Sequence, residues 1–303
     1  MAYGGRVTIN GSGSSSDAVP TGVGRTALMV AAMRAAETRR ADRLFDDPYA
    51  ADFLQASGGD PFGSENAGGG EGFADIWANF ANYAPIRTRF FDEYLREATR
   101  GIRQVVIVAA GLDTRAFRLG WAADVTVYEL DSAEVLGFKQ RVLDGCGAKP
   151  EGRRVAVAVD LREEWGSALV AAGFDAGEPS AWLVEGLVSY LTPEQNDRLL
   201  GAISGLAVSG SRISVEYLHV DAVALMGRAM SVAAGEDVES MWSGCGIGEA
   251  SAVWLDRFGW DSEAFDAFER SIAYGRELPP PGDTPIDRFT AAARNGFVIA
   301  RRR

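Results

Sequence analysis

The clearest pattern in the chain is an alternation of short apolar runs with helical stretches, which begins after residue 101. The apolar runs lie at residues 104–111, 125–130, 154–160, 181–186 and 212–217. Helical periodicity separates them, for example at 134–143 and 193–203. Continuous apolar runs of this length are typical of strands buried on both faces, and their alternation with helices predicts a parallel, doubly wound sheet. Two last strands are expected around Trp260 and at residues 297–302.

The first hundred residues instead carry helical periodicity. Apolar positions three and four apart predict a helix from Gly24 to about Arg40, and Asp47 followed by Pro48 predicts the N-cap and first residue of a short helix. Residues 73–100 place aromatic side chains at helical spacing. Pro85 lies inside this segment and predicts a kink or a division into two helices.

These patterns predict one domain after a tail. Residues 1–22 are rich in Gly and Ser without apolar periodicity, which is typical of a mobile tail. Residues 219–250 interrupt the strand–helix rhythm and are expected to form a cap. The expected divisions of the single domain 23–303 are a helical extension at 23–100, a cofactor-binding core at 101–218, the cap at 219–250 and C-terminal core strands with a helix at 251–303.

Composition removes several function classes. The chain has 303 residues, of which 47% are hydrophobic and 24% charged, so disorder throughout is excluded. The net charge of -12 repels nucleic-acid phosphates and anionic membranes, so neither is an expected partner. Two cysteines, Cys146 and Cys245, and one histidine, His219, support neither a disulfide framework nor a metal site. The absence of a long apolar run and of a signal-peptide core predicts a cytoplasmic protein.

Common nucleotide and hydrolase motifs are missing. Neither Lys139 nor Lys149 follows a glycine, so a Walker phosphate loop is excluded, and no GxSxG pentapeptide occurs. A nicotinamide-dependent reductase would need a pyrophosphate loop and usually a Tyr followed three residues later by Lys, but Tyr190 is followed at that distance by Pro193.

The ends of the first two predicted strands carry candidate ligand residues. Gly111 ends the first strand, where it either lets the backbone approach a ligand or makes an ordinary turn. Asp131 lies twenty positions later, about the separation at which an acid binds ribose hydroxyls. Glu129 is the rival for that role, and Asp131 or Ser132 is also suited to cap the next helix. An acid for ribose without a GxGxxG loop favours a nucleoside ligand that lacks phosphates, of which S-adenosylmethionine is the commonest.

The next two strand ends add three residues. Asp160 is placed to accept a hydrogen bond from an adenine amino group while Leu161 packs on the ring, or it is an exposed loop acid. Glu185 closes an otherwise apolar strand, where an unpaired charge is costly, so it needs donors that a bound cation or polar ligand would supply.

Five segments in order, RTRFFDEYL, VVIVAAGLDTRAFRL, VYELDSAEVL, VAVDLRE and WLVEGLVSYLTPEQ, resemble the leucine carboxyl methyltransferase family. These are class I S-adenosylmethionine-dependent methyltransferases, and the chain looks closest to an actinobacterial small-protein branch. The resemblance covers about residues 25–303. It implies a Rossmann-like sheet of seven strands with an N-terminal helical extension and a cap. It also implies that Arg87 holds the methionine carboxylate, Gly111 lines the cofactor turn and Asp131 binds the ribose.

The same resemblance implies that Asp160 and Leu161 bracket the adenine and that Glu185 lies by the amino group or the sulfonium. The chain departs from the glycine-rich form of the first motif, because Ala109 and Ala110 stand where glycines are found.

These observations together predict an S-adenosylmethionine-dependent O-methyltransferase acting on a carboxylate, or a hydroxyl, of a small metabolite. A carboxylate acceptor needs little acid–base chemistry because it is already ionised at neutral pH. No catalytic residue is assigned: Tyr190 is either an orienting donor or core filler, and His219 is either a base or structural. The alternatives are a non-catalytic sensor that binds the same cofactor and the nicotinamide-dependent reductase.

Overall fold

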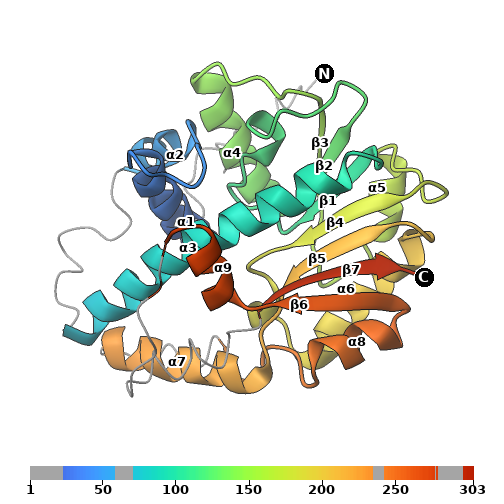
Figure 1. The fold of residues 1–303 in the computed structure, drawn as a ribbon. Coiled ribbons are helices and arrows are strands. Elements are labelled where there is room, and N and C mark those ends of the chain that lie inside the picture. Colours follow the sequence, from blue (N-terminus) through green and yellow to red (C-terminus); the bar gives the residue numbers. More distant parts are fainter. Residues whose placement is uncertain (1–22, 59–70, 235–241, 277, 279–295) are drawn as a thin grey trace, which may run out of the picture.

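The computed structural model describes residues 23–58, 71–234, 242–276, 278 and 296–303. Figure 1 shows a single sheet with helices packed on both of its faces. The strands are β1 (Gln104–Val108), β2 (Thr126–Asp131), β3 (Arg153–Ala158), β4 (Ser180–Val184), β5 (Arg212–Glu216), β6 (Trp260–Phe265) and β7 (Phe297–Arg302). The helices are α1 (Val23–Thr38), α2 (Ala50–Ala56), α3 (Glu71–Ala98), α4 (Ala133–Gly145), α5 (Gly166–Ala171), α6 (Pro193–Leu206), α7 (Val220–Ala234), α8 (Ser251–Arg257) and α9 (Ala267–Ala273), with short 3-10 helices η3 (Arg115–Phe117) and η4 (Val188–Tyr190).

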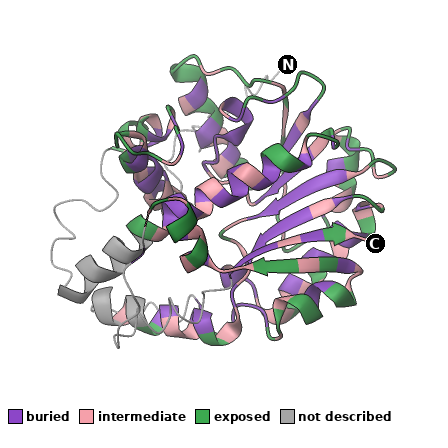
Figure 2. Ribbon diagram, viewed as in Figure 1, coloured by how far each residue is buried: buried purple, intermediate pink, exposed green. Residues whose placement is uncertain are grey.

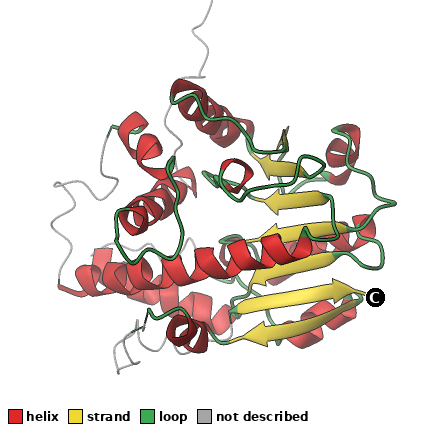
Figure 3. Ribbon diagram, turned by 45° about the horizontal axis from the view of Figure 1, so that its top comes forward, coloured by secondary structure: helices red, strands yellow, loops and turns green. Residues whose placement is uncertain are grey.

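The strand order is β3-β2-β1-β4-β5-β7-β6. Strands β1 to β5 pair in parallel, whereas β7 runs antiparallel to both β5 and β6. This confirms the predicted fold class, a mostly parallel seven-stranded sheet in a doubly wound α/β arrangement. Figure 3 shows the strands forming one layer beneath α3.

The alternation of side chains along β1 divides the core between the two faces. Val105 and Ile107 pack with residues of α1, α3 and α4, whereas Val106 and Val108 pack with residues of α5, α6, α7 and α8. Because both faces are covered, the central strands are buried throughout (Figure 2), which explains their continuous apolar sequences.

Two local predictions about the N-terminal helices were wrong: a division of the segment at Pro85 and a helix start at Pro48. Helix α3 runs through Pro85 as one helix, because packing of its aromatic face outweighs the one backbone hydrogen bond that proline cannot donate; the alternative, a kink at Pro85, stays a prediction. Helix α2 begins at Ala50 instead of Pro48. Asp47 is buried in an ion pair with Arg34 at 2.8 Å and accepts the N–H of Tyr49, so it closes a turn before the helix.

The helix starts at α4 and α6 follow the sequence closely. Ser132 is the N-cap of α4 and accepts the N–H of Val135, and Thr192 with Gln195 forms a capping box on α6.

The predicted tail, residues 1–22, and part of the predicted cap lie outside the described residues. Helix α7 forms most of the described part of the cap. The domain divisions stay predictions. None of the described helices combines the length and the apolar character needed to cross a lipid bilayer.

Candidate functional site

The site lies at the carboxyl edge of the parallel strands, where the chain connections from β1 and β4 depart to opposite faces of the sheet. Ligands of doubly wound proteins bind at such a switch point. The strand order places Asp160, Asp131, Gly111 and Glu185 along this edge, after β3, β2, β1 and β4 respectively. The sheet therefore brings four of the predicted residues to one edge, although they span 75 positions of sequence.

Asp131 ties the ends of β1 and β2 together. Its Oδ2 accepts the N–H of Gly111 at 2.7 Å, and its Oδ1 accepts the N–H of Ser132 at 2.7 Å. Burial raises the pKa of Asp131, and these two hydrogen bonds offset part of the rise. Among the described residues, no cationic side chain forms an ion pair with it. Each carboxylate oxygen keeps a second lone pair, so the group still has acceptors for the two hydroxyls of a ribose.

The rival acid Glu129 is already neutralised. It is fully buried, and its Oε2 lies 2.7 Å from Lys139 Nζ and 2.8 Å from Arg154 Nη2. Ser132, not Asp131, caps α4. The other oxygen of Glu129, Oε1, has no hydrogen-bond partner among the described residues, but it is fully buried, so Asp131 is the acid on β2 that is better placed to meet a ligand.

The turn after β1 packs beneath the N-terminal extension. Gly111 has a φ of +46°, and a Cβ at this position would lie 3.5 Å from the Cβ of Ala27 on α1. Ala109 also has a positive φ, 54°, which is strained for a residue with a side chain. The segment that follows forms only the short 3-10 helix η3. No long helix therefore presents its N-terminus to a phosphate, in keeping with the absence of GxGxxG.

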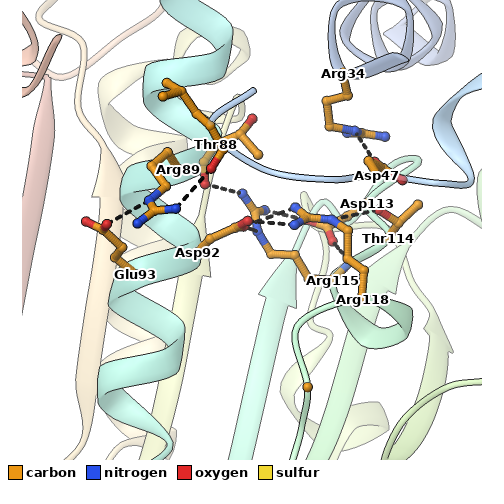
Figure 4. A network of polar contacts seen from close by, with 12 residues as sticks. Arg34, Asp47, Thr88, Arg89, Asp92, Glu93, Asp113, Thr114, Arg115 and Arg118 are labelled. Atoms are coloured by element: carbon orange, nitrogen blue, oxygen red, sulfur yellow. Dashed lines mark hydrogen bonds and ion pairs between the residues drawn. The ribbon is translucent and has the colours of Figure 1, made fainter. Parts of the chain in front are cut away.

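A buried network of charges supports this turn (Figure 4). The guanidinium of Arg115 is 3% exposed and contacts Asp92 at 2.7 Å, Glu185 at 2.8 Å and Asp113. Burial alone would raise the pKa of Asp113, but Arg115 lowers it to about 2. Arg118 binds the other oxygen of Asp92 at 2.6 Å. The network fixes the relative positions of α3, the turn after β1 and the end of β4.

Glu185 and Arg87 extend the network toward β5. Glu185 finds its cationic partners within the chain itself: Oε2 accepts a hydrogen bond from Arg115 Nη1 at 2.8 Å, and Oε1 forms an ion pair with Arg87 Nε at 2.9 Å. Arg87 Nη1 also contacts both oxygens of Glu216, at 3.1 and 3.0 Å. Within the described part of the chain, Nη2 of Arg87 has no hydrogen-bond acceptor, so its two N–H donors remain for a ligand.

Comparison with known proteins identifies the family. The model described as leucine carboxyl methyltransferase matches residues 27–204. A Streptomyces coelicolor relative named "Putative S-adenosyl-L-methionine-dependent methyltransferase" is 40% identical over 96% of each chain. A Saccharopolyspora erythraea relative with the same name is 45% identical over 74% of this chain and 79% of its own. The chain belongs to the leucine carboxyl methyltransferase family.

Membership in the leucine carboxyl methyltransferase family and the names of the relatives confirm the predicted enzyme class and cofactor, an S-adenosylmethionine-dependent methyltransferase, and the actinobacterial relatives confirm the predicted branch. Two solved structures share the fold. A methyltransferase-titled structure from Thermobifida fusca matches with a TM-score of 0.54 and 18% identity, over 87% of this chain and 94% of its own. A duf574 family protein from Streptomyces avermitilis matches with a TM-score of 0.53 and 16% identity, over 87% of this chain and 97% of its own.

Two of the family's predicted positions are less enclosed in this methyltransferase. The Asp160 side chain is 43% exposed and pairs with Arg162 at 2.6 Å, while Leu161 packs partly on the core. Both residues follow β3 at the edge of the site, and this position agrees with either prediction for Asp160, a contact with adenine or an exposed loop acid.

The described residues contain no group of three or more His, Cys, Asp or Glu arranged to hold a metal ion.

The two residues left open as catalytic candidates differ in placement. Tyr190 is half-buried beside Trp242, with ring centroids 6.2 Å apart; burial raises its pKa, and a hydrogen bond with Thr26 lowers it in part. His219 Nδ1 accepts the N–H of Asp221 at 3.3 Å. That bond uses the accepting nitrogen of the neutral ring at the start of α7, which favours a structural role for His219.

Sequence reasoning missed several residues of the site, namely Asp92, Asp113, Arg115, Arg118 and Glu216. Asp92 stands within the quoted segment RTRFFDEYL, and Asp113, Arg115 and Arg118 stand within VVIVAAGLDTRAFRL. Glu216 lies near the end of a predicted strand, as Glu185 does. The available signal was therefore an acid at the end of β5, next to an apolar run.

Proposed function

We propose that this protein is an S-adenosylmethionine-dependent O-methyltransferase whose acceptor is a carboxylate or a hydroxyl of a small metabolite. The observation that carries the proposal is Asp131, an acid without an ion-pair partner in the described residues that keeps free lone pairs at the switch point. Family membership and the names of the relatives support the choice of methyl donor.

The side chains along the edge match the parts of this cofactor in strand order. Asp131 would accept the ribose hydroxyls, and Asp160 with Leu161, one strand further out, would contact the adenine. On the other side of β1, Arg87 Nη2 would bind the methionine carboxylate, and Glu185 would face the amino group. Gly111 lines the turn between the two halves. A diphosphate finds no comparable set of donors here, because the N–H of Gly111 is taken by Asp131.

When bound, S-adenosylmethionine supplies a methyl group activated by a positively charged sulfur. The chain would contribute binding and orientation: Arg87 would hold the amino-acid end of the cofactor, Asp131 would hold its ribose, and Arg115 keeps Glu185 in place. Transfer requires the acceptor oxygen to be held about 3 Å from the methyl carbon with water excluded. Tyr190, half-buried within electrostatic reach of Arg87 and Glu216, would help to orient that oxygen. A carboxylate acceptor would need no base.

Calorimetric titration tests the cofactor. We expect S-adenosylmethionine and S-adenosylhomocysteine to bind and NADH and NADPH to give no heat, with binding lost in Asp131→Ala. Binding of the nicotinamides alone would replace the proposal with the reductase.

Isotope transfer tests the reaction and the acceptor. The protein is incubated with a metabolite extract and S-adenosylmethionine labelled in its methyl group. Labelled product that releases methanol in mild alkali is a methyl ester and shows a carboxylate acceptor, whereas an alkali-stable product is the ether expected from a hydroxyl. Cofactor binding without any transfer would favour the sensor.

A further inference from the structure

Glu216 joins three parts of the site. It ends β5, is 5% exposed, and accepts from the Tyr83 hydroxyl at 3.1 Å, from Arg87 Nη1 and from the N–H of Gly186 at 2.8 Å. These contacts link α3, β5 and the turn after β4. We propose that Glu216 is a positioning residue: it aims Arg87, and so sets the affinity of the site for the amino-acid end of S-adenosylmethionine. The inference rests on the proposed function.

The geometry of Arg87 is the first argument. A guanidinium is planar and presents its N–H donors in a fixed fork, so two anchored nitrogens determine where the third points. Glu185 anchors Nε at 2.9 Å and Glu216 anchors Nη1 at 3.0 Å. Nε is buried and holds Glu185 through an ion pair without a hydrogen bond, so Nη2 is the nitrogen whose N–H groups remain for a ligand among the contacts of the described residues. Glu185 alone would leave the fork free to turn about one contact.

The charges are the second argument. Arg115 and Arg87 already neutralise Glu185, so a second buried acid on Arg87 is not needed for charge balance, and burying it is costly. The chain also gives Glu216 a dedicated backbone donor. Gly186 adopts a φ of +68°, in the left-handed region that favours glycine, and its N–H points to Glu216 Oε2. The cost of burying Glu216 and of the left-handed backbone at Gly186 is explained if the orientation of Arg87 matters for binding.

The affinities of two ligands distinguish a role of Glu216 in positioning Arg87 from a role in holding the whole site together. S-adenosylhomocysteine carries the amino-acid end, whereas 5′-methylthioadenosine has the same nucleoside without it. Calorimetric Kd values for both are measured on the full chain and on Glu216→Gln and Glu216→Asp. The Gln side chain keeps the size but has one accepting oxygen, and the Asp side chain keeps the charge but is shorter. We expect either change to weaken S-adenosylhomocysteine about tenfold or more and to alter methylthioadenosine less than about twofold.

Tyr83→Phe provides a milder variant that keeps the acid and removes one donor. We expect a loss of about threefold for S-adenosylhomocysteine only. Glu93→Gln is the matched control, because Glu93 also accepts from an arginine and a tyrosine, Arg89 and Tyr274, but does not contact Arg87. It should leave both affinities unchanged.

The inference is overturned if the Glu216 variants keep the wild-type ratio of the two affinities, or if both ligands weaken together. Tighter binding of S-adenosylhomocysteine by Glu216→Gln would also overturn it, since the carboxylate would then act through repulsion. If wild-type protein binds neither ligand, the proposed function itself fails. That result is distinct from any change confined to the variants.

Discussion

A single carboxyl group at the ribose position gives cofactor binding a pH dependence. Burial raises the pKa of Asp131 above its ordinary 3.8, and only the ionised form offers acceptors to both ribose hydroxyls. Affinity for S-adenosylhomocysteine should therefore fall as pH drops through this raised pKa, before an unperturbed aspartate would protonate. Calorimetric Kd values measured from pH 8 down toward the acid limit of stability check this.

The Asp131→Asn variant tests the assignment of that pH dependence. It should bind about tenfold more weakly at neutral pH, because an amide has one accepting oxygen, and the acid-side loss should disappear. Asp160→Asn is the control: hydrogen bonds from Arg162 lower the pKa of Asp160 to about 2, so its removal should leave the pH profile unchanged. An unchanged profile in Asp131→Asn would contradict the assignment.

Arg115 is the residue on which the buried charge network depends for stability. Replacement by Met removes the guanidinium that Asp113 and Glu185 share in the wild-type protein. We therefore expect the free energy of unfolding, measured by urea titration at neutral pH, to fall by about 3 to 5 kcal/mol. The exposed Arg100→Met, whose side chain is 79% accessible, should leave stability unchanged. A loss below about 1 kcal/mol for Arg115→Met would show that the network is energetically neutral.

The same variant has an expected pH signature. The folded-state pKa of Asp113, about 2, lies below its ordinary 3.8, so the ionised carboxylate stabilises the fold above 3.8. This stabilisation is lost as pH falls through about 2. The difference in stability between wild type and Arg115→Met should therefore narrow over that interval.

At the scale of elements, Gly246 controls how the last part of the predicted cap, residues 242–250, packs on α7. Its φ is +105°, and a Cβ there would lie 3.0 Å from both Cα of Val220 and Cγ2 of Val223, at the start of the helix. Gly246→Ala should therefore cost backbone strain plus a displacement of α7, about 2 to 4 kcal/mol in total. Chemical denaturation would measure the loss.

Gly244→Ala is the matched control for this clash. Gly244 also has a positive φ, +72°, but a Cβ there would meet no atom within 4 Å. It should show the backbone cost alone, about 1 to 2 kcal/mol. Equal losses in the two variants would mean that α7 yields to the added methyl group without cost.

The elements that the sequence predicted well are those whose pattern is local. Continuous apolar runs located the strands because both faces of each central strand are buried, and the Thr192–Gln195 spacing located the start of α6. Pro85 does not divide its segment into two helices, because tertiary packing of a 28-residue helix outweighs the local rule. The contact between Arg87 and Glu216 joins positions 129 apart, and no local pattern encodes it. Acids at strand ends were visible, whereas their arginine partners became apparent only in three dimensions.

At the scale of the whole molecule, the strand order gathers acidic residues at one edge of the sheet, and the chain carries an excess of negative charge. The strand order brings Asp131, Glu185 and Glu216 to the same edge, and the chain as a whole carries a net charge of -12. S-adenosylmethionine carries a net charge of +1 at neutral pH, and S-adenosylhomocysteine carries none. The field of the protein therefore acts on the methyl donor and not on the demethylated product.

This difference predicts that salt weakens the binding of one ligand and leaves the other nearly unaffected, although the two share almost every contact. Raising ionic strength from about 0.01 M to about 1 M shortens the screening length from about 30 Å to about 3 Å, which removes the distant charges but not the contacts within the site. The Kd of S-adenosylmethionine should rise severalfold over this range, while that of S-adenosylhomocysteine should stay nearly constant; calorimetry at both extremes measures each. Parallel changes would mean that local contacts alone distinguish the ligands. If the slopes differ as expected, the acidity of the chain favours capture of the donor and leaves release of the product unopposed by long-range attraction.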